Sequence, residues 1–191
     1  MVRHEHDMHP RIAELVNYLI SARTHLDHAL ESVPADRRDV RPAPDRWSVA
    51  DVLQHLALTS AGMAKLFEKR AAAARAEGLG PDPETTSILW TLDVHSLLDR
   101  RRPMEAPPPV RPGDAVPADE AARRFDDAHR RLSDAIAASG DVALGRLSHP
   151  HPVLGPLNLY QWGIFAAAHE IRHAAQIRDI GVSALSASPS G

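Results

Sequence analysis

Apolar residues recur every three or four positions along four stretches of the chain, which is the spacing of an amphipathic helix. In the first stretch the apolar positions run as one stripe from Ile12 to Leu30. The four stretches predict helices over residues 10–31, 48–77, 119–139 and 158–180. The fourth stretch is apolar on two sides, so we expect it in the middle of the fold. The pattern predicts an all-α, up-down four-helix bundle.

Local signals mark several ends of these helices. Ser48 and Asp51 have the spacing of a capping box at the start of the second helix, and Asn158 and Gln161 repeat it before the fourth. Gly181 follows the last apolar position of the fourth helix and is predicted to end it.

The second and third helices are joined by a long, proline-rich segment, residues 79–117. Its prolines exclude a long helix, and its apolar residues between 88 and 98 predict a short helix or an extended piece lying over the bundle. A crossover of this length is usually functional or mobile. We therefore expect one four-helix bundle domain over residues 10–181, a flexible arm at 1–9 and a disordered tail at 182–191.

Composition narrows the possible chemistry. The 191 residues fit a single domain and include no cysteine, so disulfides, thiolate ligands and a cysteine nucleophile are excluded. The formal net charge of −3 gives no reason to expect a nucleic-acid partner. We see no apolar leader at the start and no run of about 20 apolar residues that would span a bilayer. We expect a cytoplasmic protein without a membrane partner, and the preference for arginine over lysine suggests a bacterial source.

Three histidines are the candidates for a metal site. His169 and His173 are four residues apart, which on a helix places them about 40° and about 6 Å from each other on one face. His55, on the second helix, would complete a three-nitrogen site with an open coordination position. The alternative is that these are core histidines that hydrogen-bond to carbonyl or carboxylate groups. His151 is expected at a pocket rim, and His95 is a weaker candidate for the same pocket.

Other residues break the pattern around them. Arg23 falls inside the apolar stripe of the first helix and is expected to snorkel, to pair with a carboxylate or to enter a polar pocket. Gly62 lies inside a helix at a cost of about 1 kcal/mol relative to alanine. It either opens space for a ligand or allows close helix packing, and packing is the preferred explanation. Asp51 and Glu170 are candidates for groups near the site, and Arg172 for an ion-pair partner outside it.

Two motifs together resemble the DinB superfamily of metal-binding four-helix bundles. One is RWSVADVLQHLA; the other is HPVLGPLNLYQWGIFAAAHEIRHAAQI. The resemblance implies that His55, His169 and His173 hold a divalent transition metal, reported in such proteins as zinc, nickel, iron or manganese. It also implies that some relatives are S-transferases using a low-molecular-weight thiol, and that a homodimer is plausible.

The preferred hypothesis is a metal-dependent enzyme of the thiol-dependent S-transferase type acting on a small-molecule substrate. A cation would remove the proton from a thiol and hold its sulfur, and the lack of cysteine fits a nucleophile brought by a cosubstrate. Three alternatives remain open: a metal-dependent hydrolase, a non-catalytic metal- or ligand-binding bundle related to stress or sensing, and a structural helical module.

Overall fold

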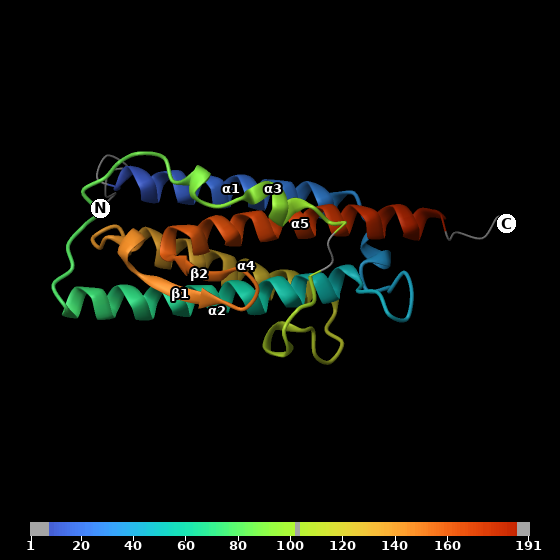
Figure 1. Cartoon of the computed structure of the whole chain (residues 1–191). Coiled ribbons are helices and arrows are strands. Elements are labelled where there is room, and N and C mark those ends of the chain that lie inside the picture. Colours follow the sequence, from blue (N-terminus) through green and yellow to red (C-terminus); the bar gives the residue numbers. More distant parts are fainter. Residues whose placement is uncertain (1–7, 102–103, 187–191) are drawn as a thin grey trace, which may run out of the picture.

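A computed structural model describes residues 8–101 and 104–186. Four long helices form the bundle that the sequence predicts (Figure 1): α1 (Pro10–Glu31), α2 (Val49–Ala76), α4 (Ala118–Ala137) and α5 (Leu159–Ser186). α1 packs mainly against α5, and α2 packs mainly against α4. The prediction of an all-α bundle is confirmed. Among the described residues no helix has the length and apolarity needed to cross a membrane.

The crossover between α2 and α4 carries the chain back along the bundle, so that these two helices run in the same direction (Figure 1). The N–H of Ala118, which begins α4, donates to Asp39 just before α2, and Arg75 at the end of α2 pairs with Asp141 beyond the end of α4. The described residues of the crossover form only short elements. These are η3 (Leu89–Thr91), α3 (Val94–Leu98) and η4 (Pro108–Val110).

Close contact between α1 and α5 depends on glycine. A Cβ on Gly163 would lie 2.4 Å from a methyl carbon of Leu15, and one on Gly181 would lie 2.9 Å from a methyl carbon of Val33. Gly181 is therefore a packing residue inside α5, which continues to Ser186, and the predicted helix end at Gly181 is wrong. Of the predicted tail, residues 182–186 are helical and 187–191 lie outside the described residues.

The other predicted helix ends agree with the structure. Ser48 and Asp51 exchange both capping-box hydrogen bonds, and Asn158 and Gln161 do the same before α5. His9, assigned to the flexible arm, instead caps α1: its Nδ1 accepts from the Arg11 N–H and its Nε2 lies 3.0 Å from the Asp82 carbonyl oxygen. Residues 1–7 of that arm lie outside the described residues.

The segment before α5 contains an antiparallel hairpin. Strand β1 (Ser148–His151) pairs with β2 (Gly155–Asn158), with Ser148 opposite Asn158 and His151 opposite Gly155. Gly155 has a φ of +77°, a conformation that glycine adopts without strain. Four-residue strands containing prolines carry almost no period-2 signal, which is why the sequence did not predict them.

The apolar core is divided into two clusters along the bundle. On α5 one cluster ends at Ala168 and the other begins at Ala174, and on α2 the corresponding gap falls between Leu56 and Met63. His169 and His173 lie in this gap on α5, and His55 lies beside it on α2. The polar centre of the molecule is thus located where the core is interrupted.

Candidate metal centre

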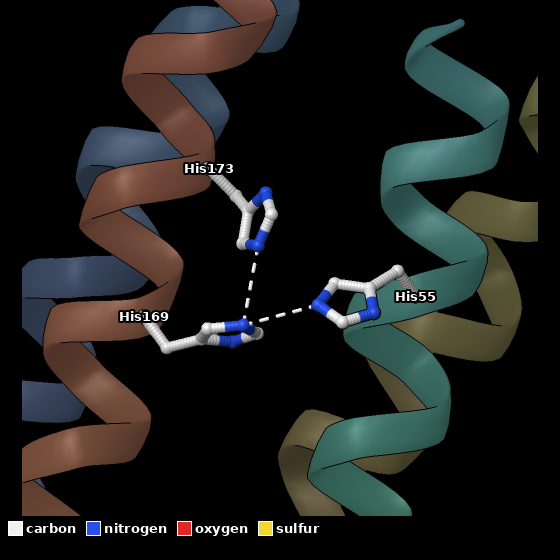
Figure 2. A group of neighbouring side chains, drawn as sticks. All are labelled: His55, His169 and His173. Carbon is white, nitrogen blue, oxygen red and sulfur yellow. Dashed lines mark hydrogen bonds between the residues drawn. The ribbon is translucent and has the colours of Figure 1, made fainter. Parts of the chain in front are cut away.

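His55, His169 and His173 meet in the bundle interior, with their rings turned toward one another (Figure 2). Nε2 of His169 lies 3.0 Å from Nε2 of His55 and 3.1 Å from Nε2 of His173. The three side chains are buried, and each offers one nitrogen within 4.8 Å of the other two. The structure therefore brings together the three histidines that the sequence singled out, across 114 positions of the chain.

Two of the rings are oriented by hydrogen bonds at their outer nitrogens. Nδ1 of His55 lies 2.7 Å from the carbonyl oxygen of Val110, and Nδ1 of His173 lies 2.8 Å from Oε1 of Gln176. Both partners are acceptors, so Nδ1 of each ring carries the proton. In the neutral ring this leaves a lone pair on Nε2, directed at the centre of the cluster.

Burial favours the neutral rings that can bind a metal. Burial lowers the pKa of His55 more than the hydrogen bond that its ring donates to the Val110 carbonyl oxygen raises it. Burial and the neighbouring His55 lower the pKa of His173 to about 3, and burial with the two other histidines lowers the pKa of His169 well below its usual range. All three are thus neutral at pH 7, the form in which imidazole coordinates a cation.

The donor set fits a divalent transition metal. Ligand nitrogens about 2.05 Å from a tetrahedral cation lie about 3.3 Å from one another, close to the separations of 3.0 and 3.1 Å observed here. Without a cation, a single proton on His169 Nε2 cannot fully satisfy the lone pairs of both neighbours. A cation between the rings would satisfy all three, and three protein ligands would leave one position open.

A cavity of about 660 Å³ opens beside the three histidines. Apolar side chains form much of its wall, among them Met63, Leu66, Trp162 and Phe165. Gly62 also lines it, and a Cβ built on Gly62 would meet no atom within 4 Å. The open-space explanation for this glycine is therefore correct, and the preferred explanation of close helix packing is wrong.

His151 lines the same cavity, as predicted for a rim residue. Its ring packs against Trp162 and Phe165, with centroid separations of 5.0 and 4.5 Å. Its Nδ1 accepts the backbone N–H groups of Val153 and Leu154 at 3.2 and 3.1 Å, so the neutral ring carries its proton on Nε2. Burial lowers the pKa of His151, which keeps that form at neutral pH.

Three of the other predicted candidates do not line the cavity. Asp51 caps α2 and forms a bidentate pair with Arg41 instead of lining the cavity. Arg23 pairs with Asp27 and Asp126, which confirms the carboxylate explanation for this residue. His95 is exposed on α3 and is likewise absent from the cavity wall.

Glu170 also points away from the cavity. Its Oε1 accepts from Nδ1 of His129 at 2.9 Å, and its Oε2 is buried without a hydrogen-bond partner in the described part of the chain. Burial raises the pKa of this carboxyl. The Glu170–His129 pair joins α5 to α4 at the level where the apolar core is interrupted.

The sequence analysis missed the groups that orient the histidines. Gln176 is three residues after His173, a helical spacing that offers a usable signal. Val110 contributes only its carbonyl oxygen from the crossover, and its identity carries no signal. Arg172 was noted only as an ion-pair candidate, whereas it lines the cavity and its Nη1 donates to the carbonyl oxygens of Leu97 and Asp99.

Comparison with known proteins agrees with this arrangement. The model of the DinB superfamily matches residues 18–177, which include all three histidines. The chain belongs to the DinB superfamily. This DinB-superfamily chain is also similar to the uncharacterized protein YuaE of Bacillus subtilis (strain 168), with 27% identity over 160 residues, covering 83% of the chain and 92% of YuaE. No solved structure gives a significant match.

Proposed function

We propose that this DinB-superfamily protein is a metal-dependent enzyme of the thiol-dependent S-transferase type. The observation that carries the proposal is the convergence of three neutral, oriented imidazole nitrogens, 3.0 and 3.1 Å apart, on the wall of an apolar cavity. His55, His169 and His173 would hold a divalent transition metal, such as zinc, nickel, iron or manganese.

A bound dication at this position supplies a positive charge and an open coordination position, which together lower the pKa of a thiol or a water molecule. The chain's own residues do the rest. Gln176 and Val110 hold two rings in the tautomer that presents Nε2 inward, and the walls formed by Trp162 and Phe165 exclude water from a small apolar substrate.

The overall reaction balances without any further cofactor. The cosubstrate thiol loses its S–H proton to solvent, and its sulfur forms a bond to an electrophilic carbon of the second substrate. The bond from that carbon to its leaving group breaks, and the leaving group departs with the electron pair. Because the chain has no cysteine, the sulfur must come from the cosubstrate.

Metal content tests the ligand assignment directly. Protein purified without a histidine tag and supplied with zinc, nickel, manganese or iron is expected to retain one ion per chain by elemental analysis. His169→Ala should abolish this binding. His95→Ala, which removes an exposed histidine outside the cavity, should retain it. Stoichiometric metal in His169→Ala, or none in the wild type, contradicts the proposed centre.

Turnover separates the enzymatic proposal from its alternatives. Metal-loaded protein should consume an electrophile only when a small thiol is present, across a panel of both. Turnover of esters or amides without a thiol would instead support a hydrolase. Metal binding with no turnover over the whole panel would support a non-catalytic binding protein.

A further inference from the structure

The cavity wall carries three arginines. Arg100 and Arg172 lie where the crossover passes α5, and the third is Arg46. Nη1 of Arg172 donates to the carbonyl oxygens of Leu97 and Asp99, each at 2.9 Å, which fixes the side chain where the crossover passes α5. Nη1 of Arg100 lies 2.6 Å from Asp179, a carboxylate whose side chain is 64% exposed. Water screens such an exposed pair, so it only weakly opposes the positive charge that Arg100 presents to the cavity.

The two charges reinforce each other. Arg172 donates to the carbonyl oxygen of Asp99, the residue directly before Arg100, so the two arginines are neighbours on the cavity wall. The acidic side chains on the cavity wall are Asp45 and Glu105, and Glu105 pairs with Arg111. One side of the cavity is therefore electropositive although the whole chain carries a formal charge of −3.

The rest of the cavity is suited to an apolar body. Trp162 and Phe165 pack edge to face, with ring centroids 5.9 Å apart, and Met63 and Leu66 continue this wall along α2. A cavity of about 660 Å³ accommodates a molecule of the size of a typical small ligand. A planar guanidinium matches a carboxylate through two parallel hydrogen bonds.

We propose that the cavity binds an apolar molecule that carries one carboxylate, with the carboxylate at Arg100 and Arg172 and the apolar body against Trp162 and Phe165. In the proposed S-transferase this ligand is the second substrate, and that assignment rests on the proposed function. The binding itself uses arginines and aromatic rings, so it can be tested without the metal.

Tryptophan fluorescence provides the assay. Trp47 and Trp162 line the cavity, whereas Trp90 is 89% exposed on η3, so a Trp90→Phe background leaves the two informative residues. We expect decanoate to bind about tenfold more tightly than decanol, and decylamine to bind more weakly than either. Equal dissociation constants for decanoate and decanol would overturn the proposal. Tighter binding of decyl phosphate than of decanoate would overturn the choice of a carboxylate.

Charge variants locate the carboxylate. Arg100→Gln should weaken decanoate binding about tenfold and change decanol binding less than about twofold. Arg172→Lys keeps the charge but loses the planar fork, so an intermediate loss is expected. Arg178→Gln is the matched control. Arg178 lies on α5, the helix that carries Arg172, but it is exposed and outside the cavity. Equal loss in Arg100→Gln and Arg178→Gln refutes the assignment.

The metal-deficient variant separates this inference from the proposed function. In His169→Ala the arginine-dependent binding of decanoate is expected to persist. Loss of decanoate binding in a folded His169→Ala variant would place the carboxylate at the histidines and overturn the inference. Persistent binding combined with a wild type that holds no metal would refute the metal centre and leave the ligand assignment standing.

Discussion

Gly62 and Gly163 offer the same substitution in two opposite environments. Both lie inside long helices, where glycine costs about 1 kcal/mol relative to alanine. Alanine at Gly62 places its methyl group in the open cavity, with no atom within 4 Å. Alanine at Gly163 places a methyl group 2.4 Å from a methyl carbon of Leu15, a fully buried side chain.

The expected effects therefore have opposite signs. Gly62→Ala should stabilise the protein by about 0.5–1 kcal/mol, which for a chain of this size raises the melting temperature by about 1–4 °C. Gly163→Ala gains the same helix propensity, but forcing Leu15 aside costs about 1–3 kcal/mol, so the net effect is destabilising.

Chemical and thermal unfolding of both variants and the wild type provides the measurement. Metal content serves as a control, because neither methyl group touches the three histidines and stoichiometry should not change. Destabilisation by Gly62→Ala would mean that the space beside this glycine is filled, and stabilisation by Gly163→Ala would mean that α1 and α5 are not in close contact. Either result would refute the packing argument.

Three further predictions follow from individual contacts. Gln176→Leu removes the acceptor of the His173 Nδ1 proton and should weaken metal binding about 10–100-fold in a chelator competition, and unchanged affinity would contradict the orienting role. The metal-free protein should lose stability as the pH falls from about 6.5 toward 3, because the unfolded chain takes up protons on histidines that stay neutral when folded. Denaturant titrations between pH 7 and 5 measure this slope, and His173→Leu should reduce it. Glu170→Ala removes the hydrogen-bond partner of His129 and leaves a buried gap, so we expect the free energy of unfolding to fall by about 3 kcal/mol. A fall of less than about 1 kcal/mol would contradict the buried pair.

Local features of the chain were predictable because they depend on neighbours a few positions away. The apolar period located the four long helices, and the capping boxes at Ser48 and Asn158 located two of their starts. The same reasoning failed at Gly181, because the residue that explains this glycine is Val33, which lies just after the end of α1 and far away in the sequence. It also failed for the hairpin, whose strands are too short for a readable alternation.

The sequence by itself determined the four long helices, the absence of thiolate ligands and the face shared by His169 and His173. Only the tertiary structure decided that His55 meets them, that a carbonyl of the crossover orients His55, and that Gly62 opens onto a cavity rather than onto a helix. Helical periodicity and capping act over three or four residues, and so they are written in the local sequence. Contacts across more than a hundred positions depend on how whole helices pack, and residue spacing alone does not encode that packing.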